Sequence, residues 1–356
     1  MTAAPRSLRR KLSGWVPLVR MGLGAVRHRL TGHDAPLNVM IALTDDCTSD
    51  CGYCDIPARA HPSLSTERLR RVLDELAARG TCRVGFWGGE PLLRADLAEL
   101  IAHARQLGMW VSLVSNGDLV PRHIDRIADL DHLLLSLDGA EEAHDRQRTK
   151  GSHARVLDAL DAARSAGIPA WTLTVLTRHN LDDVAWLVDL AQARGHRAAF
   201  QVLHHAEALD GGRGSALHPD NSDLRAILEW LKTAKKAGRP VANSLWQLDQ
   251  LLRWPDLQRP APVRDASAPT CLGGRLFFNI DTAGEVYPCS LLIGGAEDTP
   301  PSMPPPSVAT GDVAEALAAV PEPPCNRCAA TAFTEYNGLL ALRPEVVGGW
   351  VRGLWG

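Results

Sequence analysis

Short apolar runs alternate with amphipathic stretches through the first two thirds of the chain. Runs bounded by turn residues predict buried β-strands, and apolar residues recurring every three to four positions between them predict helices. The expected strands cover 37–44, 83–87, 110–115, 132–137, 170–176 and 197–203. The expected helices cover 65–79, 96–107, 123–130, 154–166 and 181–194. This alternation predicts an α/β fold with a parallel sheet and right-handed crossovers.

The last third of the chain has a different pattern. We expect helical structure over 221–254, a linker over 255–269, a β-hairpin over 275–287, a proline-rich loop over 299–307 and helices over 312–320 and 333–354. The chain then divides into an N-terminal helical element (1–36), a core barrel (37–220), a helical linker (221–269), a small α+β domain (270–330) and a C-terminal helix (331–356).

The N-terminal element is basic and amphipathic. Its apolar residues recur at helical spacing, at Leu8, Leu12, Trp15, Val16, Val19, Leu23, Val26 and Leu30, among seven Lys and Arg residues. Pro17 is expected to divide the stretch into two helices. Such an element either lies on an anionic membrane or a hydrophobic substrate, or packs on the surface of its own domain. No signal peptide or membrane span is predicted, so we expect a cytoplasmic protein, peripheral at the membrane in the first case.

Composition narrows the class of protein. The 356 residues are 45% hydrophobic and 22% charged, with a formal net charge of −3, which is ordinary for a globular protein and gives no reason to expect nucleic-acid binding. Seven of the eight cysteines fall into two clumps. In a chain without a signal peptide, this pattern favours metal or cluster ligands in a reducing compartment over disulfides.

The first clump is Cys47, Cys51 and Cys54, directly after the first expected strand. An ordinary [4Fe–4S] cluster takes four thiolates, so three thiolates on one loop indicate a cluster with one iron left for another ligand. A zinc site with a distant fourth ligand has the same spacing and stays an alternative at this point.

Further motifs follow the next strands. Gly88-Gly89-Glu90-Pro91 comes after the second strand, Ser115-Asn116-Gly117 after the third and Ser136-Leu137-Asp138-Gly139 after the fourth. In this order, over roughly 37–205, the motifs resemble those of the radical S-adenosylmethionine (SAM) superfamily. The resemblance implies a partial (β/α)6 barrel in which Cys47, Cys51 and Cys54 hold three irons of a [4Fe–4S] cluster and SAM chelates the fourth.

The same resemblance implies roles for SAM-binding residues. Gly88 and Gly89 would let the backbone approach the methionine part of SAM, and Glu90 would pair with its ammonium group. Each residue also has a plainer explanation, because glycines and acidic residues are common in tight turns.

Other strand-end residues would surround the rest of the cofactor. Ser136 and Asp138 match positions that contact the ribose, and Asn116 lies near the same rim. Arg148 matches a position that reaches the SAM carboxylate, and Tyr53 matches an aromatic position near adenine. Alternatively, Ser136 and Asp138 are turn or cap residues and Arg148 forms a surface ion pair.

The second clump is Cys271, Cys289, Cys325 and Cys328. With Gly284 and the hairpin between the first two cysteines, it resembles the twitch form of the SPASM/twitch auxiliary-cluster domains. That resemblance implies a second [4Fe–4S] cluster with four protein thiolates; a structural zinc ribbon is the alternative. Cys82 stands apart and is expected to be a buried structural thiol.

These features together predict a radical SAM oxidoreductase. Reductive cleavage of SAM, with flavodoxin or ferredoxin as the reductant, would lead to hydrogen abstraction from a small molecule such as an alcohol or sugar-like metabolite, and the auxiliary cluster would accept an electron. Alternatives are a redox-neutral epimerase, a lipid- or isoprenoid-modifying enzyme and a zinc-binding scaffold. Peptide modification is less expected, because only about 36 residues precede the first strand. No catalytic residue is assigned; candidates near the substrate are His204, His205, Glu207, Asn243 and Trp246.

Overall fold

The computed structural model describes residues 6–203, 213–257, 271–293 and 304–355. All six predicted strands are present: β1 (Asn38–Ala42), β2 (Arg83–Trp87), β3 (Trp110–Ser115), β4 (His132–Ser136), β5 (Ala170–Leu176) and β6 (Arg197–Val202). Each pairs in parallel with the next in chain order. The predicted α/β fold with a partial barrel is therefore confirmed.

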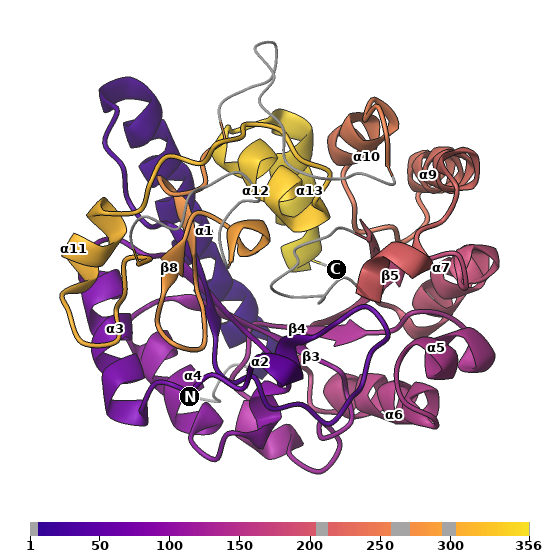
Figure 1. Ribbon diagram of the computed structural model, residues 1–356, viewed down its shortest axis with the longest axis horizontal. Helices are drawn as coiled ribbons and strands as arrows, with labels where there is room; N and C mark the ends of the chain where they lie inside the picture. The colour runs from indigo at the N-terminus through magenta and orange to yellow at the C-terminus, as the bar shows by residue number, and fades with distance from the viewer. Residues whose placement is uncertain (1–5, 204–212, 258–270, 294–303, 356) are drawn as a thin grey trace.

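The outer face of this sheet packs against helices. They are α3 (Thr66–Ala78), α4 (Leu97–Gln106), α5 (Glu141–Gln147), α6 (Ser152–Ser165), α7 (Val184–Arg194) and the short 3-10 helix η2 (Ile124–Ile127). Figure 1 shows them in purple and magenta around the left, lower and right-hand sides of the sheet. Alternate strand residues such as Val39, Ile41 and Phe86 are fully buried in this layer. The other alternate positions therefore face the inside of the barrel.

The hairpin of the C-terminal region joins the same sheet. It consists of β7 (Phe277–Ile280) and β8 (Val286–Tyr287), which pair antiparallel. Strand β7 also pairs in parallel with β1, so one eight-stranded sheet runs in the order β6-β5-β4-β3-β2-β1-β7-β8. The hairpin thereby places its cysteine-bearing ends beside the barrel.

Helix α12 (Thr331–Leu340) bridges the open side of the barrel. Its Phe333 stacks on Phe277 of β7 at a centroid distance of 5.8 Å, and its Thr331 hydroxyl donates to the Phe200 carbonyl of β6 at 3.1 Å. In Figure 1, α12 and α13 (Pro344–Trp355) lie together in yellow between β8 and α10 (Leu245–Leu252).

The structure corrects two helix predictions in the last third. The stretch expected to be helical over 221–254 forms two helices, α9 (Asn221–Lys236) and α10. The closing helix expected over 333–354 is also two helices, α12 and α13. Between them, Leu342 has a positive φ of 56°. Pro344 begins α13, a position at which the backbone N–H that proline lacks would have no partner within the helix. Helix α11 (Val313–Ala318) lies within its predicted range.

The prediction that Pro17 divides the N-terminal element is wrong. A single helix, α1 (Arg6–Thr31), runs through it. Pro17 is buried and shares a small cavity with Leu18 and Met21, so packing on the domain outweighs the local helix-breaking effect. None of the helices in the described part of the chain is long and apolar enough to span a membrane.

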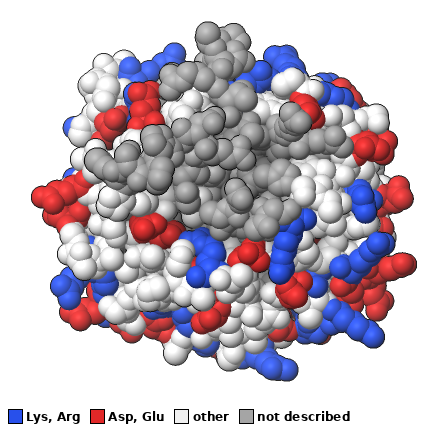
Figure 2. All heavy atoms as spheres, in the orientation of Figure 1, with Lys and Arg blue, Asp and Glu red and all other residues white. Residues whose placement is uncertain are grey.

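Charged side chains of both signs are interspersed on the surface. On the face shown in Figure 2, blue and red groups alternate around the rim, and the described residues there form no broad patch of one sign. This distribution agrees with the small net charge of the chain.

Candidate active site

The loop that carries the first three cysteines is tied to the end of α5. The Gly52 N–H donates to the Gln147 carbonyl at 2.8 Å, and the Asp50 N–H donates to the Thr149 hydroxyl at 3.2 Å. Two hydrogen bonds to a segment about a hundred residues later hold the loop across the C-terminal edge of the sheet.

The three thiols on this loop are at least half-buried. Burial raises the pKa of Cys47 and Cys54, and it raises that of Cys51 to about 12. Nitrogen donors face two of the sulfurs: Asn116 Nδ2 lies 3.6 Å from Cys47 Sγ, and Arg148 Nη1 lies 3.6 Å from Cys51 Sγ. Three thiols on one loop, two of them facing N–H donors from other segments, fit an iron–sulfur cluster. Such donors stabilise thiolate ligands, and a metal binds the deprotonated form of a cysteine.

Gly88 and Gly89 bring the end of β2 against the chain that leads to Cys47. A Cβ on Gly88 would lie 2.4 Å from the Thr44 carbonyl oxygen, and one on Gly89 would lie 2.2 Å from the Asp46 carbonyl oxygen. The Gly89 N–H donates to the Thr44 carbonyl at 2.7 Å. The sequence predicts that these glycines let SAM approach. In the structure, a residue with a Cβ at either position would collide with the backbone that leads to the cysteine loop.

Glu90 lies at the centre of this turn and is fully buried. Its Oε1 accepts from the Leu92 N–H at 3.1 Å, and its Oε2 accepts from the Ser115 hydroxyl and the Asn116 N–H, both at 2.9 Å. Burial raises the pKa of Glu90 to about 7, and these three hydrogen bonds limit the rise. Glu90 thus joins the ends of β2 and β3, and near neutral pH a bound cation would favour its ionised form.

Asn116 connects the end of β3 to the cysteine loop. Its Nδ2 donates to the Thr48 hydroxyl at 3.0 Å as well as pointing at Cys47, and its Oδ1 accepts from the Asp118 N–H at 2.9 Å. Both ends of the amide are engaged, so its orientation toward the loop is fixed.

Tyr53, Asp138 and Arg148 form one buried cluster beside Cys51. Arg148 Nε donates to Asp138 Oδ2 at 2.6 Å, and the Tyr53 hydroxyl donates to the same oxygen at 2.5 Å. Arg148 Nη2 also lies 2.5 Å from the Tyr53 hydroxyl. Burial alone would lower the pKa of Arg148, but the Asp138 carboxylate raises it well above its ordinary value, so the guanidinium stays charged. The three residues proposed separately for ribose, carboxylate and adenine therefore contact one another.

Sequence reasoning missed the residues that hold this cluster. The Asp138 N–H donates to His144 Nδ1 at 3.0 Å, and burial lowers the pKa of His144 to about 4, which keeps the imidazole neutral as an acceptor. Asn180 Nδ2 donates to the Asp138 carbonyl at 2.6 Å. The sequence around Arg148 contains His144 and Gln147, but nothing in their spacing identifies these partners.

Ser136 lies at the C-terminal end of β4, in register with Leu173 of β5, and is 9% exposed. Its position alternates with the outward-facing Leu135, so its side chain faces the barrel interior. The same interior face carries Trp87, Trp110 and Trp171, which are half-buried. The indole N–H of Trp87, directly before Gly88, is buried without a hydrogen-bond partner among the described residues. Trp87 therefore lies next to the strand-end motifs, whereas Trp110 and Trp171 lie near the opposite ends of their strands.

The second cysteine set surrounds one small cavity of about 20 Å³. Cys271, Cys289, Cys325 and Cys328 all line it, together with Asn337. Burial raises the pKa of Cys328 to about 12. Among the described residues, no three His, Cys, Asp or Glu side chains converge closely enough to hold a single metal ion.

A nitrogen donor also faces this second set. Asn337 Nδ2 lies 3.5 Å from Cys271 Sγ, while Asn337 Oδ1 accepts from the Leu272 N–H at 2.8 Å. The Gly273 N–H lies 3.4 Å from the same sulfur. Four thiols around one cavity, with N–H donors to one of them, fit a cluster held by four protein ligands.

The other residues predicted to lie near the substrate are not placed in the site by the described part of the structure. His204, His205 and Glu207 lie outside the described residues. Asn243 is buried, and its side chain bonds the N–H and the carbonyl of Phe200 in β6 and the Gln247 side chain in α10, so it joins these two elements.

Trp246 and Cys82 also have structural neighbours. The Arg343 guanidinium lies over the Trp246 ring, with its carbon 4.7 Å from the ring centroid. Cys82 is 2% exposed and precedes β2, at the end of the strand remote from the cysteine loop.

Known proteins are similar to this chain both in sequence and in fold. Residues 41–191 match the family model described as the radical SAM superfamily. The PqqA peptide cyclase of Rhodopseudomonas palustris is 33% identical over 266 residues, covering 71% of this chain and 67% of the relative. The PqqA peptide cyclase of Xanthomonas oryzae pv. oryzae is 32% identical over 272 residues, covering 73% and 69%.

A solved structure has the same fold. Streptococcus suis SuiB bound to S-adenosylmethionine superposes with a TM-score of 0.63 at 15% identity, covering 83% of this chain and 69% of SuiB. At this identity the similarity shows the fold alone.

Proposed function

The chain belongs to the radical SAM superfamily, and on that basis we propose that it modifies a peptide by abstracting a hydrogen atom from it. As a member of this family it is an enzyme that uses a [4Fe–4S] cluster and SAM. The observation that carries the peptide substrate is the 33% identity to a PqqA peptide cyclase over about seven tenths of the chain. This relationship counts against the small-molecule substrate expected from the sequence.

Cys47, Cys51 and Cys54 are the proposed ligands of the SAM-binding cluster. Bound there, cluster and SAM supply a 5′-deoxyadenosyl radical through one-electron reductive cleavage of SAM. The donors Asn116 Nδ2 and Arg148 Nη1 would keep two of the thiolates hydrogen-bonded. The hydrogen bonds from Gly52 and Asp50 to the end of α5 would keep the loop at the strand ends.

Glu90 is proposed to receive the ammonium group of SAM. Its pKa of about 7 means that a nearby positive charge converts it to the carboxylate near neutral pH. The rigid turn at Gly88 and Gly89 holds that carboxylate at a fixed distance from the cysteine loop, since backbone atoms on both sides are in contact.

The proposed substrate space is the inner face of the barrel next to these groups. Trp87, half-buried at the C-terminal end of β2, offers an apolar surface there, and exclusion of water would protect a reactive radical from side reactions. The indole N–H of Trp87, which has no hydrogen-bond partner among the described residues, is suited to donate to a peptide carbonyl.

Net oxidation of the peptide is the proposed outcome. Homolytic cleavage of a substrate C–H bond would transfer the hydrogen atom to the deoxyadenosyl carbon and leave one unpaired electron on the substrate. Cys271, Cys289, Cys325 and Cys328 would hold an auxiliary cluster that could accept this electron. Loss of a proton from the substrate would complete the removal of two hydrogens.

A fractionation experiment tests the proposal. Extract of the source cells is separated into a retained peptide fraction and a small-molecule filtrate, and each is incubated anaerobically with enzyme, SAM and dithionite. We expect the peptide fraction to stimulate 5′-deoxyadenosine formation and protease digestion to abolish the effect. Stimulation by the filtrate alone, or stimulation that survives digestion, would overturn the proposal; Cys47→Ala is the inactive control.

A further inference from the structure

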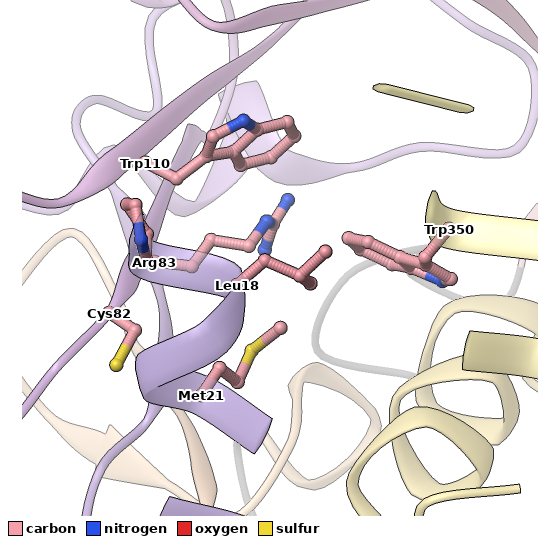
Figure 3. Close-up of a pocket in the computed structure, with 7 residues that line it drawn as sticks. Leu18, Met21, Cys82, Arg83, Trp110 and Trp350 are labelled. Carbon is pink, nitrogen blue, oxygen red and sulfur yellow. The ribbon is translucent and has the colours of Figure 1, made fainter. Parts of the chain in front are cut away.

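One side of α1 packs against the rest of the protein. Met21 and Ala25 are buried, and Figure 3 shows Leu18 and Met21 directed toward Arg83, Trp110 and Trp350. The helix also approaches the body closely at Gly24, where a Cβ would lie 2.5 Å from the Leu37 side chain. Helix α1 is therefore fixed in orientation, and the side that it presents outward is fixed too.

The outward side carries an uncovered apolar row. Of the six exposed large hydrophobic side chains in the described part of the chain, five lie on α1: Val16 (59% exposed), Val19 (54%), Leu23 (64%), Val26 (38%) and Leu30 (78%). Figure 1 shows the end of α1 that leads into β1 projecting at the upper left of the molecule. Scattered exposed apolar residues need no explanation, but a continuous row along one helix marks a contact surface.

The row has the spacing of a coiled-coil seam. Its members are separated by three, four, three and four residues, which places them at successive a and d positions of a heptad. A strict a/d row is narrower than the apolar stripe of ordinary surface helices and matches one partner helix. In this register Leu18, Met21 and Ala25 occupy the c and f positions, which accounts for their packing on the body.

The positions beside the seam are positively charged. Arg27 occupies an e position and Arg29 a g position, and both are exposed. Arg20, at the other e position, is half-buried and its Nη1 lies 3.5 Å from the Gly108 carbonyl oxygen, so it faces the body of the protein. The whole of α1 contains seven Lys and Arg residues and no Asp or Glu. Charges at e and g select the partner of a coiled-coil helix, so this seam favours a helix flanked by carboxylates.

Two other occupants fit less well. A second copy of α1 would bring the same arginines together along the seam, and like charges there oppose pairing. An anionic bilayer would also attract the arginines, but membrane-surface helices bury a broad face containing bulky aromatic residues. The exposed row contains only Val and Leu, and Trp15, at the neighbouring g position, is half-buried.

We propose that α1 is a docking site for an acidic amphipathic helix of a partner protein, which pairs with the seam Val16–Val19–Leu23–Val26–Leu30 and places its Asp and Glu side chains against Arg27 and Arg29. The partner helix buries the seam and forms ion pairs on both sides of it. This docking site is distinct from the barrel interior and does not depend on the identity of the substrate.

Two synthetic heptad peptides test the proposal with the full, cluster-loaded protein. Both have Leu and Val at a and d; one has Glu at e and g, the other Lys. We expect wild type to bind the Glu peptide and to bind the Lys peptide at least about tenfold more weakly, with added salt reducing the difference. The double variant Arg27→Glu/Arg29→Glu should reverse the preference, and Leu23→Gln should weaken both.

Controls separate docking from folding. Arg122→Glu, an exposed charge reversal away from α1, should bind as wild type does. All variants should keep wild-type SAM cleavage with dithionite, because the substituted residues are remote from the cysteine loop.

Three results would overturn the proposal. The first is absence of binding to the Glu peptide or equal binding of both peptides. The second is binding to phosphatidylglycerol vesicles without peptide binding, which would assign the surface to a bilayer. The third is self-association in sedimentation that Leu23→Gln abolishes, which would assign it to a second copy.

Discussion

Arg148 Nε lies 2.6 Å from Asp138 Oδ2, and the side chains are 8% and 0% exposed. A buried ion pair of this kind adds little stability over an apolar replacement of both partners, but removing one partner leaves an uncompensated charge. Because Arg148 also faces Cys51 Sγ at 3.6 Å, the pair couples the stability of the β4 end to the position of the cysteine loop.

Arg148→Met should therefore destabilise the protein by about 3–5 kcal/mol, since Asp138 stays buried without its cation. The double variant Arg148→Met/Asp138→Asn should recover part of this loss. Urea unfolding under anaerobic conditions measures both. Arg164→Met breaks an exposed pair with Asp161 and should change stability by less than about 1 kcal/mol. Equal effects of the buried and the exposed substitution would contradict the role of the pair.

Glu90→Gln should change how stability depends on pH. The pKa of the Glu90 carboxyl is about 7 in the folded protein and about 4.3 in the unfolded chain. Below about pH 4 both states hold the proton, and the free energy of unfolding is at its full value. As pH rises toward 7 the unfolded chain releases the proton first, so the free energy of unfolding falls. Between pH 5 and pH 8, wild type should lose up to about 3 kcal/mol relative to Glu90→Gln.

Urea unfolding at the two pH values, without SAM, checks this prediction. Glu142→Gln removes an exposed carboxylate from α5 and serves as the matched control, with the wild-type pH profile expected. Parallel pH profiles for wild type and Glu90→Gln would show that Glu90 does not titrate in this range.

Gly89→Ala tests the contact between the second strand end and the cysteine loop. The added Cβ would meet the backbone oxygens of Asp46 and Asp45 at 2.2 and 2.6 Å, and backbone cannot move aside without displacing Cys47. We expect a loss of about 1–3 kcal/mol of stability and a fall in 5′-deoxyadenosine formation on the order of a hundredfold. Gly349→Ala, in α13 with open space around it, should leave both unchanged. Wild-type activity of Gly89→Ala would refute the positioning role.

The second cysteine set is tested by metal content. Wild type reconstituted anaerobically should contain about eight Fe per chain, and Cys325→Ala about four, with SAM cleavage by dithionite retained. Cys82→Ala removes a buried thiol outside both sets and should keep the full iron content. About four Fe plus one Zn in wild type would instead support the zinc ribbon.

The strands and the edge that carries the site could be predicted because their signals are local. Fully buried parallel strands are nearly continuous apolar runs, and polar groups placed after each run must meet at one edge of the sheet. The contacts within the site could not be predicted in the same way. Tyr53 and Asp138 are 85 positions apart, and no periodicity indicates that one hydroxyl donates to the other.

The errors of prediction also have physical causes. Pro17 normally interrupts a helix, but tertiary packing of Leu18 and Met21 keeps α1 continuous. The SAM contact of Gly88 and Gly89 stays a prediction; the structure adds that their tightest contacts are with Thr44 and Asp46 of their own chain. Pro344 starts a new helix within 333–354, where apolar residues recur at helical spacing on both sides of it and the pattern alone predicts one helix.

The most direct test of a peptide substrate is the source of the hydrogen atom in 5′-deoxyadenosine. The peptide fraction and the filtrate are prepared from cells grown in deuterated medium and incubated separately with unlabelled SAM, dithionite and the anaerobically reconstituted enzyme. Mass spectrometry should find deuterium in 5′-deoxyadenosine from the peptide fraction and none from the filtrate. Deuterium transfer from the filtrate alone would contradict the account.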